Sequence, residues 1–118
     1  MKTNSFKDLI VWQRGMEVAR VVYEITDTFP SKEQYGLVSQ MRRSAVSIPS
    51  NIAEGHRRGT QKDFLQFLRI ADGSAAELET QAILAEELYP KSSAWAKFRS
   101  LLSEVQRMLG AMQKKFSK

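Results

Sequence analysis

Few side chains in this sequence of 118 residues have the types and spacing that catalysis or metal binding requires. The single histidine, His56, cannot form a two-histidine metal site within one subunit, although an oligomer could gather several copies. Glu54 lies two residues before His56, but side chains two apart on a helix point to different faces. Glu54 is better interpreted as a buried or interfacial hydrogen-bonding partner of an arginine. Because cysteine is absent, a thiolate zinc site and a cysteine nucleophile are excluded.

The serines and the polar amides also lack the surroundings of a catalytic or ligand-binding site. No Gly-x-Ser-x-Gly turn surrounds a serine, and no lysine or second histidine is placed to activate one. A glycine-rich loop that could cradle phosphate is absent as well. Gln40 and Asn51 could line a ligand pocket, but we favour the interpretation that they satisfy backbone groups or fix helix register around Pro49. We therefore predict that the protein is not an enzyme and has no cofactor.

The charges are more informative because they are unevenly distributed. The sequence has 18 basic and 13 acidic residues, for a net charge of +5, which suggests an anionic partner. Residues 40–62 hold five basic side chains against Glu54 alone, whereas residues 63–89 hold six acids against one base. The basic side chains could contact nucleic-acid phosphates, or many could pair with the acids of residues 63–89 within or between subunits. Both alternatives are open for Arg42 and Arg43, which lie in the middle of a predicted helix. The three cations that flank a turn, Arg57, Arg58 and Lys62, are expected to be exposed.

Apolar residues recur at alternating three and four spacing in four segments, which predicts four helices at about residues 7–28, 31–58, 60–89 and 92–115. Asn4 or Ser5 could cap the first helix, and the run from Ser31 to Gln34 has the form of a capping box for the second. Thr60 opens the third helix, and Pro49 is expected to kink the second.

The connections between the four predicted helices are short, which forces neighbouring helices to run antiparallel. We therefore predict an all-α fold with one domain over residues 1–118, an up-down-up-down antiparallel four-helix bundle. The first helix carries two apolar stripes and the last carries a widened one. This is more apolar surface than one core can bury, so we also predict a homo-oligomer.

No apolar run approaches the roughly 20 residues that span a bilayer, so we expect no contact with a membrane. The polar first residues do not resemble a secretion signal, and the sequence has no disulfide framework. These features together predict a cytoplasmic protein.

The run from Ser47 to Gly55, with its core Asn51-Ile52-Ala53-Glu54-Gly55, resembles the 23S rRNA intervening-sequence proteins. The likeness extends to the run from Phe6 to Gln13, to Phe29-Pro30 and to the Gln40-Met41-Arg42-Arg43 run, and it continues through residues 64–81. It makes Gln40, Pro49, Asn51, Glu54 and Gly55 the family-motif positions of this chain. The resemblance covers nearly the whole sequence, but residues 88–93 show no family pattern.

The resemblance implies a homo-oligomeric four-helix bundle, a pentamer in the typical case. The family is also similar to the accessory variability protein of diversity-generating retroelements, a basic pentamer that engages nucleic acid and a reverse transcriptase. Two functions follow as hypotheses. The first is an oligomeric scaffold that binds RNA or DNA backbone through basic residues, and the second is an adaptor that recruits another protein, such as a nucleic-acid enzyme.

Overall fold

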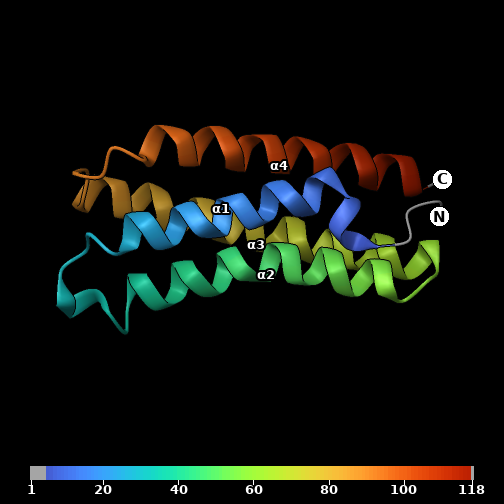
Figure 1. The fold of residues 1–118 in the computed structure, drawn as a ribbon, viewed down its shortest axis with the longest axis horizontal. Helices are drawn as coiled ribbons and strands as arrows, with labels where there is room; N and C mark the ends of the chain where they lie inside the picture. Colours follow the sequence, from blue (N-terminus) through green and yellow to red (C-terminus); the bar gives the residue numbers. More distant parts are fainter. Residues whose placement is uncertain (1–4, 118) are drawn as a thin grey trace.

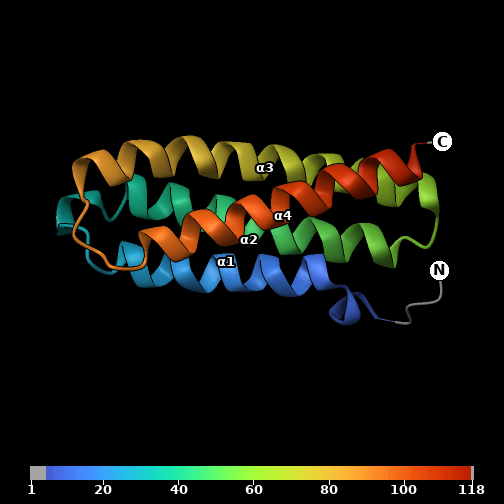
Figure 2. The same cartoon turned by 90° about the horizontal axis from the view of Figure 1, so that it is seen from above.

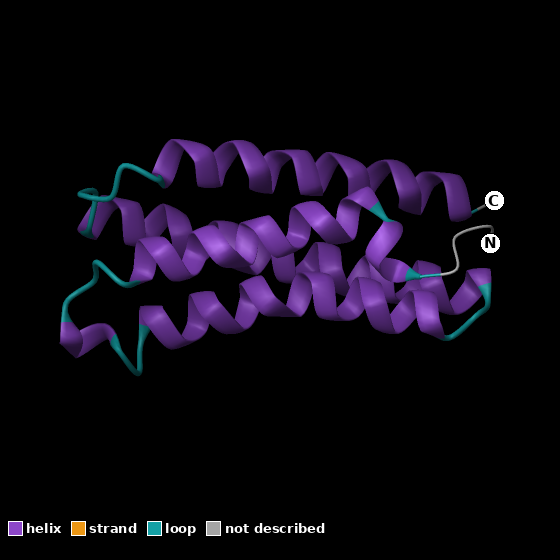
Figure 3. Cartoon of the chain, in the orientation of Figure 1, coloured by secondary structure: helices purple, strands orange, loops and turns teal. Residues whose placement is uncertain are grey.

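A computed structural model describes residues 5–117 of the chain, and within that range it contains helices and no strand (Figures 1 and 3). Two short 3-10 helices, Phe6–Asp8 and Ser31–Glu33, precede the first and second long helices. The four long helices are α1 (Ile10–Thr26), α2 (Leu37–Arg57), α3 (Gln61–Leu88) and α4 (Trp95–Phe116). The prediction of an all-α chain with four helices is therefore confirmed.

The four helices lie side by side along the long axis of a molecule that measures 44 × 23 × 20 Å (Figure 1). The α1–α2 and α3–α4 connections lie at one end of this axis. The α2–α3 turn lies at the other end, together with the C-terminal end of α4 (Figures 1 and 2). Viewed from above, α1 and α3 lie on opposite sides of the molecule, and α2 and α4 lie between them (Figure 2).

One hydrophobic core runs between the helices, and it follows the predicted apolar spacing in α2, α3 and α4. Every predicted position of the α2 stripe is buried, and so is every position of the α3 stripe within that helix. In α4 the stripe is buried from Trp95 to Leu109, whereas Met112 and Phe116 near the helix end are half-buried. Core formation thus fixes which face each of these helices turns inward.

The two apolar stripes of α1 have different environments. Val18, Val22 and Ile25 belong to one stripe and are fully buried in the core. In the other stripe Met16 is half-buried, and Tyr23 leaves 45% of its surface exposed. The prediction that α1 has more apolar surface than its own core can bury is therefore confirmed.

The start of α2 differs from the prediction. The run from Ser31 to Gln34 forms a 3-10 helix rather than a capping box, and α2 begins six residues later at Leu37. The Glu33 carboxylate accepts a 2.6 Å hydrogen bond from the Tyr89 hydroxyl. The same carboxylate accepts the backbone N–H of Leu37 at 3.3 Å, so it caps α2 from outside the helix.

The other boundaries are closer to their predicted places. Ser5 caps the first 3-10 helix by accepting the Lys7 N–H, and α1 begins only at Ile10; Asn4 lies outside the described residues. Thr60 caps α3 as predicted. Among the described residues, no helix combines the length and the apolar character that crossing a membrane needs.

Pro49 lies inside α2 and is buried, and the helix continues through it to Arg57. Gly15 of α1 packs against the proline ring, since a Cβ at Gly15 would lie 3.6 Å from the Pro49 Cβ. A proline inside a helix removes one N–H donor, which destabilises the helix. At this position the ring also makes an apolar contact between α1 and α2. The kink expected at Pro49 stays a prediction.

Candidate nucleic-acid interface

Three of the predicted cations lie around the turn that joins α2 to α3. Gly59 adopts a φ of 85°, in the left-handed region that favours glycine, and this allows α2 to end and the chain to reverse. Thr60 then accepts the Asp63 N–H at 3.1 Å and starts α3. Arg57, Arg58 and Lys62 are all exposed around this turn, as expected from the sequence.

Two further lysines reach the same end of the molecule from α4. The amide of Gln61 donates to the Phe116 carbonyl at 3.3 Å, and the rings of Phe64 and Phe116 lie 5.5 Å apart. These contacts dock the last turn of α4 against the start of α3. The basic end, as we name this surface, consists of Arg57, Arg58, Lys62, Lys114 and Lys115, all of them exposed.

These two lysines could not be joined to the α2–α3 turn from the sequence alone, because most of α3 and α4 separates them along the chain. The signal that could have joined them is Phe116, which continues the apolar spacing of α4 and therefore must pack against another helix.

The acids near the basic end are mostly engaged locally. Glu54 accepts Arg58 Nη2 at 3.0 Å across one turn of α2, and the Arg58 guanidinium also lies 5.0 Å from the centre of the Phe67 ring. Glu54 is therefore an arginine partner as interpreted, but it is exposed and on the same helix rather than buried or interfacial. The Asp63 carboxylate accepts the Thr60 hydroxyl at 2.9 Å. Within residues 5–117, the cations of the basic end other than Arg58 make no ion pair.

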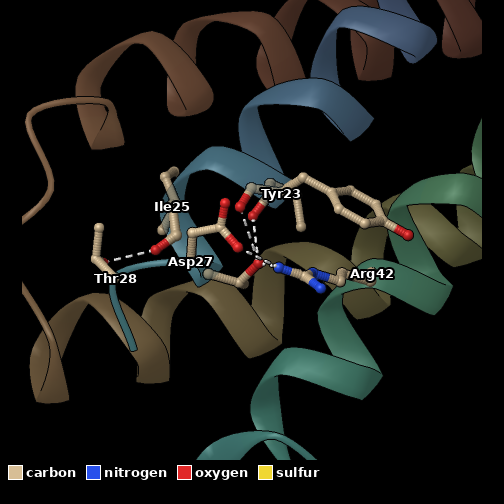
Figure 4. Close-up of polar contacts among 7 residues, drawn as sticks. Tyr23, Ile25, Asp27, Thr28 and Arg42 are labelled. Atoms are coloured by element: carbon tan, nitrogen blue, oxygen red, sulfur yellow. Dashed lines mark hydrogen bonds and ion pairs between the residues drawn. The ribbon is translucent and has the colours of Figure 1, made fainter. Parts of the chain in front are cut away.

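Arg42 is held at the other end of α2 by the C-terminus of α1 (Figure 4). Its Nε donates to Thr26 Oγ1 at 2.9 Å and its Nη2 donates to Asp27 Oδ1 at 3.0 Å. The guanidinium also lies 4.3 Å from the centre of the Tyr23 ring. A cation is favourable at a helix C-terminus, where unpaired carbonyls concentrate negative charge. Arg42 is therefore paired, but with α1 and not with the acids of α3.

Arg43 is exposed, but it does not belong to the basic end. Fourteen residues of α2 separate it from Arg57, which is about 21 Å at 1.5 Å per residue. The five cations predicted to contact nucleic acid therefore do not form one surface. Three lie at the α2–α3 turn, and Arg42 and Arg43 lie near the start of α2.

The family-motif residue Asn51 joins neighbouring turns and helices rather than opening a pocket. Its Nδ2 donates to the Ser47 carbonyl at 2.8 Å and to Ser47 Oγ at 2.9 Å. Ser47 Oγ in turn shares a 2.8 Å hydrogen bond with Ser74 Oγ of α3. Gln40 is different, because it is exposed and its side chain makes no hydrogen bond with the described residues. Gln40 therefore satisfies no backbone group around Pro49 among the described residues, and the alternative that it fixes helix register stays a prediction.

Gly55 marks the place where α2 and α3 approach most tightly. A Cβ at this position would lie 2.5 Å from the Cβ of Phe67 and 3.3 Å from Cδ1 of Phe64. No side chain fits in that space, so the glycine is required by close helix packing and not by an unusual backbone angle.

His56 follows Gly55 and is buried beneath the basic end. Only 9% of its surface is exposed, and its ring meets the Phe64 ring edge to face at a centroid distance of 6.0 Å. Neither ring nitrogen has a hydrogen-bond partner among the described residues. The residues described include no group of three or more potential metal ligands, with or without His56.

The model of the family described as 23S rRNA-intervening sequence protein matches residues 7–111 of the chain. The chain belongs to this family. Among curated proteins, none matches the chain. A crystal structure from Bacteroides thetaiotaomicron, a protein of unknown function from the S23 ribosomal protein family, is similar with a TM-score of 0.76. The match covers 88% of this chain and 98% of that one, and at 24% identity it supports the fold alone.

In this member of the 23S rRNA-intervening sequence protein family, the most recognisable run of sequence lies on the α2–α3 contact. Gly55 faces Phe67 of α3, and Asn51 is joined to Ser74 of α3 only through the hydroxyl of Ser47. These residues build the scaffold, whereas the cations that could meet a partner lie beyond them on the turn.

Proposed function

We propose that this protein is a non-enzymatic, cytoplasmic scaffold that assembles as a homo-oligomer and contacts the backbone of RNA or DNA through its basic end. Each subunit is an antiparallel up-down-up-down bundle, so the α2–α3 turn and the end of α4 occupy one pole. The observation that supports the proposal best is the gathering of five exposed cations at that pole from two separate parts of the chain.

Phosphate contact is the mode of binding that this surface favours. Recognition of single-stranded bases needs exposed aromatic platforms on which bases stack. At the basic end Phe64 is instead buried, and Phe67 and Phe116 are half-buried against neighbouring helices. The well-exposed aromatic side chains, Tyr23 and Tyr35, lie near the α1–α2 connection at the other end of the molecule. Flexible cations with few acids nearby neutralise phosphates without reading base edges, so binding should depend weakly on sequence and steeply on salt.

Assembly would give the basic end useful affinity. One subunit offers five cations, of which Arg58 is already paired with Glu54. A ring whose subunits all point the same way repeats the basic end at one level, and linked weak sites act together on a long polyanion. We propose a pentamer, the assembly that the family resemblance implies.

The test replaces Arg57 and Arg58 with alanine and measures binding of structured RNA and duplex DNA by fluorescence anisotropy over a salt series. We expect weaker binding to all sequences and a flatter plot of log affinity against log salt, by about 0.9 for each duplex-DNA phosphate that is no longer neutralised. Arg43→Ala removes a positive charge from outside the basic end and is the matched control. Sedimentation of both variants checks that assembly is intact.

Absence of binding by the wild type at ~50 mM salt would reject the proposal, because electrostatic binding is strong under that condition. The alternative of an adaptor that docks an acidic protein on the same cations would then lead. Pull-down from cells with and without nuclease distinguishes the two functions, since a contact bridged by nucleic acid disappears on digestion.

A further inference from the structure

An apolar groove of about 550 Å³ runs along the outer surface between α1 and α2. Its walls include the α1 stripe that the core leaves out, and Tyr23 and Val46 expose 45% and 42% of their surfaces there. Arg20 is the one charged residue in its lining. The α1–α2 groove, as we name it, is lined by Trp12, Met16, Ala19, Arg20, Tyr23, Val46, Pro49, Ser50 and Ala53.

A second apolar surface lies on α3, the helix on the opposite side of the molecule from α1 (Figure 2). Leu84 and Leu88 expose 50% and 53% of their surfaces, and they lie one turn apart on the helix. Glu77 and Glu87 lie seven residues before and three residues after Leu84, which places them on the same face. The α3 outer face, as we name it, consists of Ile70, Glu77, Leu84, Glu87 and Leu88, all of them exposed.

The charges of these two surfaces are complementary and are not satisfied within the subunit. Arg20 on the groove makes no ion pair with the described residues, and neither do Glu77 and Glu87 on the α3 outer face. No arginine of α2 pairs with an acid of α3 within residues 5–117, because Arg42 binds Asp27 and Arg58 binds Glu54. Glu77 and Glu87 are therefore available to a cation of a second subunit.

We infer that the α1–α2 groove binds the α3 outer face of a second copy of this chain, in a head-to-tail contact. The inference rests on the homo-oligomer of the proposed function and names its interface. A symmetric contact of groove against groove would bring two Arg20 side chains together and leave both α3 outer faces uncovered. The head-to-tail contact instead brings Arg20 near acids and covers both apolar surfaces. Because the two surfaces are different parts of the subunit, repetition of the contact produces a ring when the rotation closes.

The test uses one acidic substitution on each surface. Val46→Asp places a carboxylate in the groove, and Leu84→Asp places one on the α3 outer face; both residues are already partly exposed, so the fold tolerates the change. We expect each variant to be a monomer at concentrations where the wild type assembles, with a dissociation constant raised about a hundredfold because a carboxylate has to be desolvated where an apolar side chain was buried. Ala96→Asp, at an exposed position in the first turn of α4, is the matched control and should assemble like the wild type.

Mixing the two variants tests the head-to-tail geometry itself. The Val46→Asp variant retains a sound α3 outer face and the Leu84→Asp variant retains a sound groove, so an equimolar mixture should form a dimer and nothing larger. Light scattering coupled to size exclusion measures each mass, and circular dichroism checks that both variants are folded.

The outcomes separate this inference from the proposed function. A wild type that is monomeric at micromolar concentration overturns both. A wild-type oligomer that survives either substitution overturns only the interface, and so does a mixture that remains monomeric.

Discussion

Replacing Gly55 with alanine tests the close approach of α2 and α3 with a single methyl group. The added Cβ would lie 2.5 Å from the Cβ of Phe67, far inside van der Waals contact. That atom is the root of the Phe67 side chain, so it can move away only if the backbone of α3 moves with it. Overpacking of this kind costs about 1–3 kcal/mol and occasionally more.

Helix propensity acts in the opposite direction, because alanine is favoured over glycine inside a helix by about 1 kcal/mol. We take the cost at the upper part of its range, about 2–3 kcal/mol, because the contact is with a side-chain root. After the gain of about 1 kcal/mol in helix propensity, Gly55→Ala should lower the free energy of unfolding by about 1–2 kcal/mol. For a domain of this size that corresponds to roughly 3–6 °C in the melting temperature for each kcal/mol.

The propensity term can be measured separately in the same protein. Gly73 in α3 and Gly110 in α4 are exposed, and a Cβ at either position would meet no described atom within 4 Å. Gly73→Ala and Gly110→Ala should therefore stabilise the fold by about 0.5–1 kcal/mol. Urea unfolding followed by circular dichroism, at one fixed protein concentration, compares all three variants with the wild type. If Gly55→Ala were stabilising to the same degree as the two controls, the tight α2–α3 contact would be refuted.

Two further predictions concern contacts between distant parts of the chain. Arg42→Ala should lower the free energy of unfolding by about 1 kcal/mol because it removes the hydrogen bonds to Thr26 and Asp27, yet leave the salt dependence of nucleic-acid binding unchanged; a flatter salt dependence would show that Arg42 contacts phosphate. Tyr89→Phe removes the hydrogen bond that lowers the pKa of Glu33 below 4.5 and raises the pKa of Tyr89 above 10.0. A lowered carboxyl pKa stabilises the fold above the unfolded value and is lost as pH falls, whereas a raised tyrosine pKa stabilises it below the unfolded value and is lost as pH rises. The stability difference between wild type and Tyr89→Phe should therefore be largest at about pH 5–9 and shrink on both sides, and a difference independent of pH would contradict this coupling.

The predicted core faces were correct because they depend on a local property that the sequence carries directly. Leu68, Ala75 and Leu78 are buried because their spacing follows one side of a helix, whatever that helix packs against. The α3 cap at Thr60 was predictable for the same reason, since its partner, Asp63, is three residues away. Such features require no knowledge of the tertiary structure.

The start of α2 could not be predicted from local pattern, because the carboxylate that accepts its first N–H also binds a residue far away in sequence. The capping box predicted between Ser31 and Gln34 does not form; instead Glu33 accepts the Leu37 N–H, and the Tyr89 hydroxyl, 56 residues on, donates to the same carboxylate. The backbone of Gly36 adds a second break, with φ −110° and ψ −112°, outside the helical region. A local signal was therefore overridden by a tertiary contact.

Charge counting had the same weakness at the candidate interface. It identified residues 40–62 as basic and residues 63–89 as acidic, and suggested pairing between them. In the structure Arg42 pairs instead with Asp27, at the end of α1. This contact depends on where the end of α1 lies relative to α2, which charge counting does not include. The lysines at the end of α4 joined the basic end only through the packing of Phe116.

The small residues of the α2–α3 contact bear on why Met16 and Tyr23 of α1 lie outside the core. Gly55 brings α2 against α3, and the Ser47–Ser74 hydrogen bond holds the same two helices together earlier along α2. Helices that pack this closely leave a narrow core between the four elements. Val18, Val22 and Ile25 fill the part that α1 supplies, whereas Met16 and Tyr23 line the α1–α2 groove. Tight packing within the subunit and apolar surface for a second subunit are thus two consequences of one arrangement of residues.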